Sequence, residues 1–274
     1  MRFHEWKTAS RHLRRVCALL AGSALAGIAA PALAGSVTQP GETVGLAAGT
    51  PLPPGVYVVD TTDYGSIGKE TLGVTIPVVA WSTPAKLLGG RVQLYAAWPL
   101  AEASVPGAHV QGWYNPWVAG QLAWDLGNNI GVSYLLGMYP KLTSPVANDA
   151  TTINQRFAVS YTGNGYNLTA NLIIGNEVDN SSVDAQKVPN YLNLDLTATK
   201  SFGKWSFGPV GYYSTDTNTP YGGYSKQHQF AVGGLAGYNF GPVILQTYLT
   251  HAVTQSGYLG NDTRFWFRFI IPVA

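Results

Sequence analysis

The chain has 274 residues, of which 46% are hydrophobic and 11% charged, and it contains one cysteine. Five of the 16 Lys and Arg residues but only one of the 14 Asp and Glu residues lie in the first 34 positions. Residues 35–274 therefore carry 11 positive and 13 negative side chains, a net charge of −2. These residues therefore lack the excess of positive charge that nucleic-acid binding requires. Because the single cysteine is Cys17, disulfides and thiolate metal sites are excluded for residues 35–274.

Residues 1–34 have the three parts of a secretory signal peptide. Basic residues extend from Arg2 to Arg15, an uncharged segment of 13 residues follows from Val16 to Ile28, and Ala32-Leu33-Ala34 precede the predicted cleavage point. The apolar segment is shorter than the roughly 20 residues that a spanning helix needs. We therefore expect the mature chain to begin at Gly35.

The mature chain has low charge, many Gly, Tyr and Trp residues, and no apolar run long enough for a transmembrane helix. Two classes remain, a secreted all-β domain and an outer-membrane β-barrel. Residues 35–55 are small, polar and Pro-rich without a period, which predicts an irregular N-terminal extension. Their composition leaves open whether this extension lies in the periplasm or enters the barrel as a plug.

Residues 56–274 repeat a strand pattern. Most of the predicted strands have 8 to 12 residues, close to the roughly 9 to 11 that cross a bilayer at barrel tilt. The best alternation is in residues 191–202, and the earliest strands are weaker, with Pro77 poorly placed in the second. The twelve predicted strands are 56–63, 74–82, 91–100, 117–125, 130–139, 155–162, 166–176, 191–202, 204–215, 227–240, 243–253 and 263–272.

The connections in the last nine strands alternate in length. Tight turns at residues 126–129 and 163–165, at Gly203 and at Gly241-Pro242 have hairpin chemistry. The intervening loops are long and polar, at residues 140–154, 177–190, 216–226 and 254–262. Outer-membrane barrels have short periplasmic turns and longer extracellular loops. The pattern therefore predicts an antiparallel up-and-down transmembrane barrel with an even number of strands, 12, and both chain termini in the periplasm.

The final strand, 262–272, separates two kinds of side chain. Phe265, Phe267 and Phe269 share one face, and Arg264 and Arg268 share the other. We expect the aromatic face to contact lipid and the charged face to line the lumen. Aromatic residues near other strand ends predict interfacial girdles, and the ones we assign there are Trp81, Trp98, Trp113, Trp117, Trp124, Tyr139, Tyr161, Tyr166, Phe202, Trp205, Tyr238 and Phe240.

Four sequence segments resemble those of the MetA-pathway phenol-degradation family, whose members are outer-membrane β-barrels. They are LPPGVYVVDTTDYGS (52–66), GNGYNLTANLIIGNEVDN (163–180), GYNFGPVILQTYLTHAV (237–253) and GNDTRFWFRFIIPVA (260–274). The resemblance implies that the protein assists the entry of hydrophobic compounds into cells that degrade aromatic compounds. The family usually ends in a Val-Pro-Phe-like sequence, whereas this chain ends Pro272-Val273-Ala274, which bears on its recognition by the barrel assembly machinery.

Strand parity predicts which polar side chains face the lumen. We assign the solute path to Asp60, Arg156, Asp195, Arg264, Trp266 and Arg268. Closing the barrel would place Asp60 across the seam from Arg264 or Arg268, where a charge network would set the polarity of the lumen. The alternative is a seam or plug contact that has no role in selectivity.

We predict no cofactor and no metal site, because no His, Asp or Glu spacing fits one. A surface lipid hydrolase is the enzymatic alternative, although His228, His251 and Ser256 form no recognisable catalytic phrase. The sequence thus favours a passive outer-membrane channel for small hydrophobic or aromatic compounds, surrounded by outer-membrane lipid. The other alternative is a structural barrel that transports nothing.

Overall fold

The computed structural model describes residues 35–258 and 260–273, so the predicted signal peptide lies outside the described residues. Antiparallel strands make up most of this part, with two single turns of 3-10 helix, η1 (Gly163–Gly165) and η2 (Asp184–Gln186). The strands are β1 (Gly55–Ile67), β2 (Glu70–Leu87), β3 (Gly90–Ala97), β4 (Leu100–Val105), β5 (Ala108–Trp113), β6 (Trp117–Asp125), β7 (Ile130–Tyr139), β8 (Thr151–Tyr161), β9 (Tyr166–Asp179), β10 (Tyr191–Phe202), β11 (Trp205–Asp216), β12 (His228–Asn239), β13 (Ile244–Ser256) and β14 (Asp262–Pro272). No helix among the described residues has the length and apolar character needed to cross a membrane.

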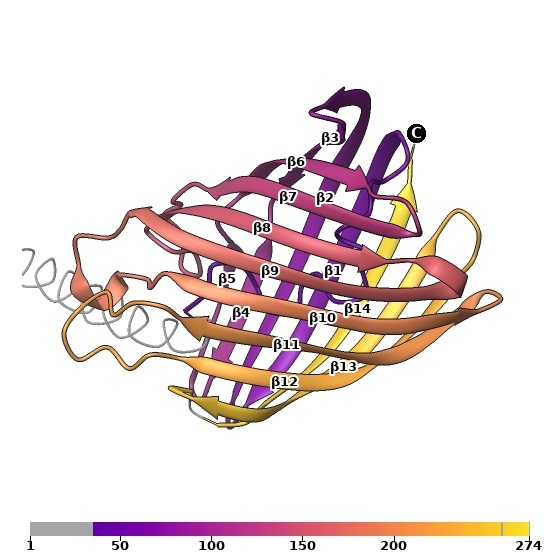
Figure 1. Cartoon of the computed structure of the whole chain (residues 1–274). Helices are drawn as coiled ribbons and strands as arrows, with labels where there is room; N and C mark the ends of the chain where they lie inside the picture. Colours follow the sequence, from indigo (N-terminus) through magenta and orange to yellow (C-terminus); the bar gives the residue numbers. More distant parts are fainter. Residues whose placement is uncertain (1–34, 259, 274) are drawn as a thin grey trace, which may run out of the picture.

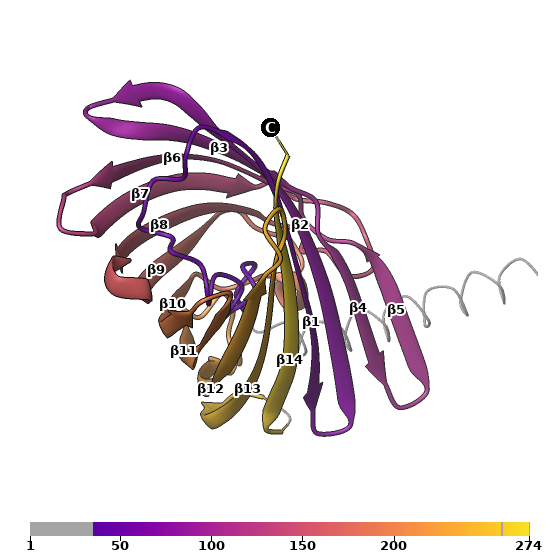
Figure 2. The ribbon, with the colours of Figure 1, turned by 90° about the vertical axis from the view of Figure 1, so that its right-hand side faces the viewer.

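The sheet closes into a barrel because β1 pairs with β14 on one side and with β2 on the other. Twelve strands, β1–β3 and β6–β14, form the closed ring (Figure 1). The β4–β5 hairpin is attached to the first half of β2 and extends the wall beside it (Figure 2). The predicted fold class and strand number are therefore confirmed.

The β4–β5 hairpin was not predicted. It forms where the ladder of hydrogen bonds between β2 and the following strand is interrupted. The second half of β2 pairs with β3 and the first half pairs with β4, with the change opposite Trp98 and Pro99. Pro77 and Pro99 have no backbone N–H to donate, so a continuous ladder cannot pass through this point. The strand predicted at residues 91–100 consequently ends at Ala97 and resumes at Leu100.

The two faces of the wall differ as a membrane barrel requires. On β14, Phe265 is 51% exposed on the outside, whereas Trp266 and Arg268 are fully buried inside. The same alternation continues along β8, where Phe157 faces outward and Arg156 inward. The assignment of the two faces of the last strand is confirmed.

Turn lengths also follow the prediction from β6 onward. Two to four residues join β6 to β7, β8 to β9, β10 to β11 and β12 to β13, whereas the longer loops of residues 140–150, 180–190 and 217–227 join strands at the opposite end. The loop predicted at 254–262 is shorter than expected, because β13 extends to Ser256 and only residues 257–261 separate it from β14. β1 begins and β14 ends at the short-turn end. Gly35, however, lies at the long-loop end, where its backbone N–H donates to Gln227 Oε1 at 2.5 Å. Gly35 and the end of β14 therefore lie at opposite ends of the barrel, although β1 begins beside the end of β14. The periplasmic placement of both termini stays a prediction.

Residues 35–54 lie inside the barrel and form a plug (Figure 2). Its residues are buried or half-buried except Pro53 and Pro54, and it runs from the long-loop end through the lumen to the first residue of β1. The sequence left the periplasm and the lumen as alternatives for this segment, and the structure places it in the lumen.

Candidate functional site

The first part of the plug is held by long polar side chains of the wall. Asn193 Nδ2 donates to Ser36 Oγ at 2.9 Å and to the Thr38 carbonyl at 3.2 Å. Thr38 Oγ1 lies 2.7 Å from the Tyr191 hydroxyl. All four residues are buried. These hydrogen bonds therefore compensate their polar groups for the contacts with water that are lost on burial.

Two opposite charges hold the backbone of the next plug residues. The Asp195 carboxylate accepts hydrogen bonds from the Gly41 and Thr43 backbone N–H groups, each at 2.9 Å, and from Thr43 Oγ1 at 2.6 Å. From the other side, Arg268 donates to the backbone carbonyls of Glu42 and Val44. Hydrogen bonds to charged groups contribute roughly 1.5–3 kcal/mol each, so this clamp is the strongest attachment of the plug.

The last part of the plug crosses the lumen near the short-turn end. The Ala48 carbonyl accepts from Gln121 Nε2 at 3.1 Å and from Ser133 Oγ at 2.8 Å. Gly49 then packs backbone to backbone against Gly131 of β7, and a Cβ on either glycine would clash with the other. Contact between these two backbone segments at this distance requires glycine at both positions.

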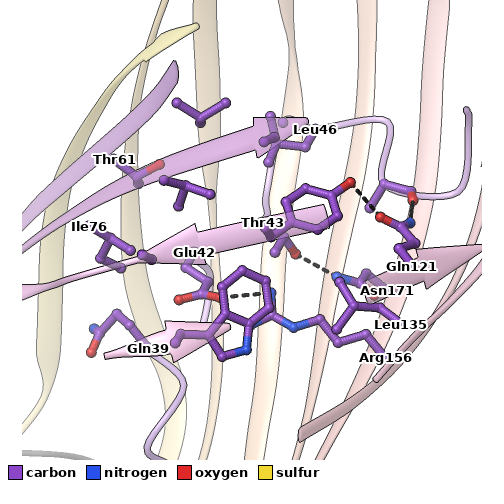
Figure 3. A pocket seen from close by; sticks show the side chains of 18 of the residues that line it. Gln39, Glu42, Thr43, Leu46, Thr61, Ile76, Gln121, Leu135, Arg156 and Asn171 are labelled. Carbon is purple, nitrogen blue, oxygen red and sulfur yellow. Dashed lines mark hydrogen bonds and ion pairs between the residues drawn. The ribbon is translucent and has the colours of Figure 1, made fainter. Parts of the chain in front are cut away.

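A cavity of 460 Å³ remains between the plug and one side of the wall. Its volume is within the roughly 300–1,000 Å³ of small-molecule sites. Figure 3 shows it bounded by plug residues such as Leu46 and by wall residues such as Ile76 and Leu135. The aliphatic wall side chains that line it are Val59, Val74, Ile76, Val78, Ala80, Ala97, Ala101, Leu135, Ile244 and Ile270.

One ion pair lies in this cavity. Arg156 Nη1 is 2.8 Å from Glu42 Oε1 (Figure 3). The Arg156 guanidinium lies 4.4 Å from the centre of the Trp117 ring. Arg156 is also fixed by Asn154, which accepts from its Nε at 2.8 Å. Burial raises the pKa of Glu42, and the neighbouring Arg156 acts in the opposite direction.

Aromatic rings and unpaired polar atoms complete the lining. Trp117 stands between Tyr95 and Tyr139, with ring centres 5.9 and 6.1 Å away. Among the described residues, Trp117 Nε1, Asn171 Oδ1 and Thr50 Oγ1 are buried without a hydrogen-bond partner, and all three residues line the cavity. The cavity therefore offers ring surfaces and a few polar atoms to a small amphiphilic molecule.

The charge network at the seam differs from the predicted one. Arg264 pairs with Asp63 at 2.6 Å and with Asp262 at 2.7 Å. Asp60 lies on the outer face of β1, because its neighbours Val59 and Thr61 line the cavity. The prediction that Asp60 faces inward and pairs with Arg264 or Arg268 is therefore wrong, and Asp63 occupies that position.

The other predicted path residues all face the lumen but differ in their contacts. Arg156 lines the cavity, whereas Asp195 and Arg268 bind the plug. Trp266 stacks on Tyr248 with ring centres 5.1 Å apart and donates from Nε1 to Thr250 Oγ1 at 3.1 Å, so it is part of the packed lumen beside the plug.

Sequence reasoning missed three features of the cavity. Trp117 and Tyr139 were assigned to the lipid girdles, but both are buried in the lumen. Their strand parity, shared with the inward Gln121 and Leu135, could have identified them. Glu42 was missed because the plug has no periodic pattern.

Each histidine among the described residues pairs with a hydroxyl group across the sheet. Each lies opposite a hydroxyl residue of the neighbouring strand and contacts it through Nδ1. The pairs are His109 with Ser104 at 2.8 Å, His228 with Ser256 at 2.8 Å and His251 with Thr263 at 2.7 Å. Within the described residues no carboxylate bonds to any of these histidines, and no group of three or more His, Cys, Asp or Glu side chains is placed to hold a metal ion. The repeated geometry is that of a cross-strand pair.

A family model described as "Putative MetA-pathway of phenol degradation" matches residues 58–269. The chain is similar to the solved COG4313 outer membrane channel from Pseudomonas putida F1, with a TM-score of 0.65 and 10% identity over 86% of this chain and 100% of that chain. It is also similar to the NanC porin, with a TM-score of 0.53 and 10% identity over 79% of this chain and 100% of that chain. No curated protein sequence matches the chain. At these identities the similar structures establish the fold.

Proposed function

The chain belongs to the family described as "Putative MetA-pathway of phenol degradation", and on that premise we propose that it is an outer-membrane channel assisting passive uptake of small hydrophobic or aromatic compounds. Solutes of the phenol type bind in the cavity between the plug and the apolar wall, and they pass while the middle of the plug stays attached. The apolar outer face contacts outer-membrane lipid, and the short turns face the periplasm.

The unequal lumen is the observation that supports this proposal. Asp195 and Arg268 hold the plug against one side, whereas Val74, Ile76 and Val78 leave an apolar surface free on the other. An open porin for hydrophilic solutes has a polar, water-filled lumen. An apolar surface instead favours a solute with a hydrocarbon ring, because burial of such a ring contributes about 1.5–3 kcal/mol.

Uptake of labelled toluene and phenol into proteoliposomes that contain lipopolysaccharide tests this function. We expect the protein to raise the initial rate above that of protein-free liposomes. The variant Ala97→Trp fills the cavity, because Ala97 is buried in its lining, and it should remove most of this increase.

The adjacent variant Ala96→Trp is the matched control, because Ala96 is exposed on the outer face of the same strand. It should transport as the unmodified protein does. If the protein gives no increase, it is a structural barrel, and if both tryptophan variants behave alike, the cavity is not the path.

A further inference from the structure

We propose that Glu42 sets the charge selectivity of the channel: by neutralising Arg156 it makes the cavity accept neutral aromatic solutes and reject aromatic carboxylates. This inference rests on the proposed function and deepens it. It assigns a specificity-determining role to a plug residue that touches the solute cavity.

Glu42 and Arg156 are the only charged residues among those that line the cavity. Three further charged residues contact the plug and do not belong to the lining: Asp195 and Arg268 bind its backbone, and Asp63 accepts from Gln39 Nε2 at 3.0 Å. The electrostatic character of the cavity therefore depends on this one ion pair, whose atoms are 2.8 Å apart.

Both partners are fixed, so the neutralisation is a stable property of the site. Arg156 is held by Asn154 Oδ1 at 2.8 Å and by the face of Trp117 at 4.4 Å. Glu42 is held through its own carbonyl, which accepts from Arg268 at 2.5 Å. Their side chains are only 8% and 11% exposed, and water therefore screens the pair weakly.

Without the carboxylate of Glu42, the same residues would form a site for an aromatic anion. The guanidinium of Arg156 can bind a carboxylate through two parallel hydrogen bonds. The neighbouring rings of Trp117 and Tyr95, which also line the cavity, would contact the aromatic ring of the bound carboxylate. Glu42 thus occupies, from within the chain, the position that the carboxylate of a benzoate-like solute would take.

The experiment compares benzamide and benzoate, which have the same ring and shape and differ in one charge. Fluxes into proteoliposomes that contain lipopolysaccharide are measured at pH 7.5, after subtraction of protein-free liposomes. The unmodified protein should pass benzamide at least about tenfold faster than benzoate. Glu42→Gln should raise the benzoate flux about tenfold, the size expected for one hydrogen-bonded charge pair, and leave benzamide within about twofold.

Two variants separate selectivity from loosening of the plug. Glu177→Gln removes an inward carboxylate that bonds to Thr152 and does not line the cavity, and it should change neither flux. Glu42→Gln combined with Arg156→Gln removes both charges and should return benzoate to its original low flux.

The outcomes distinguish the two proposals. Absence of protein-dependent benzamide flux contradicts the proposed function and the selectivity with it. Equal fluxes of benzamide and benzoate through the unmodified protein overturn only the selectivity. An equal rise of both solutes in Glu42→Gln also overturns it, because that result indicates a displaced plug.

Discussion

The two sides of the lumen wall treat the plug differently. The inner faces of β9, β10, β13 and β14 present amides, hydroxyls and charges that bind the middle of the plug. The wall of β1–β4 presents mostly aliphatic side chains to the cavity, and it contacts the plug at Gln39, which donates to Asp63, and at Leu52, which bonds to Gln93 and Ser82. One barrel thus contains a binding surface for its own chain and a mostly aliphatic surface beside the cavity. On the proposed function, this difference lets a hydrophobic molecule pass while the plug stays bound to the polar side.

Deletion of the plug should have the largest effect. A mature chain lacking residues 36–50 loses the segment that fills the lumen, and we expect single-channel conductance in planar bilayers to rise at least about tenfold as water enters. The preference for aromatic solutes should disappear together with the second wall of the cavity. Unchanged conductance would show that the plug does not occlude the lumen.

Asp195→Ala should detach the middle of the plug. The variant removes three hydrogen bonds to a buried carboxylate, each contributing roughly 1.5–3 kcal/mol. Hydrogen exchange of the amides of residues 41–45, followed in nanodiscs, should accelerate at least about a hundredfold. Asp195→Asn retains one acceptor oxygen and should give a smaller increase, and similar rates in all three proteins would argue against the clamp.

Ile76→Thr should weaken solute binding on the apolar side without affecting the plug. Ile76 lines the cavity, and replacing part of its aliphatic surface by a hydroxyl costs about 1–2 kcal/mol of burial energy for an aromatic ring. We expect toluene flux to fall about three- to tenfold. Val79→Thr, on the outer face of the same strand, is the control and should leave toluene flux unchanged.

Acidification should have the smallest effect, and it should resemble Glu42→Gln. Burial raises the pKa of Glu42 above its usual 4.5. As the pH falls, the Glu42 carboxylate therefore takes up a proton at a higher pH than an exposed glutamate does. The charged groups that act on it are Arg156, Arg268 and Asp195. Benzoate flux relative to benzamide should rise between pH 7.5 and pH 5, and a matching rise in Glu42→Gln would rule out titration of Glu42 as the cause.

The same contrast explains how far the sequence predicts the structure. Where the lumen wall is polar, as in β10 and β14, inward Asn193 and Arg268 alternate with outward apolar residues, and the two faces are assigned correctly. On β1, Tyr57 and Val59 face an apolar cavity while Val58 faces outward. Alternation of polarity is lost there, and for that reason Asp60 was assigned to the wrong face. The weak pattern of the early strands follows from the apolar cavity that they line.

Two further features have local physical reasons. The β4–β5 hairpin turns at Pro106-Gly107, with Gly107 at φ +87, and this pair is a turn signal that the strand assignment did not use. The path of the plug is not readable from its residues, because Asp195 and Arg268 bind mainly backbone N–H and C=O groups. Backbone recognition imposes little pattern on the sequence that is recognised.

In the proposed function, solutes pass while the plug remains attached to the polar side of the wall. The double variant Thr43→Cys with Asn171→Cys tests it most directly, because these side chains meet at 3.0 Å between Oγ1 and Nδ2 and residues 35–274 contain no other cysteine. Oxidation would fasten the plug to β9. Equal rates of toluene uptake in the oxidised and reduced forms are predicted, whereas loss of uptake on oxidation, restored by a reductant, would show that the plug has to leave.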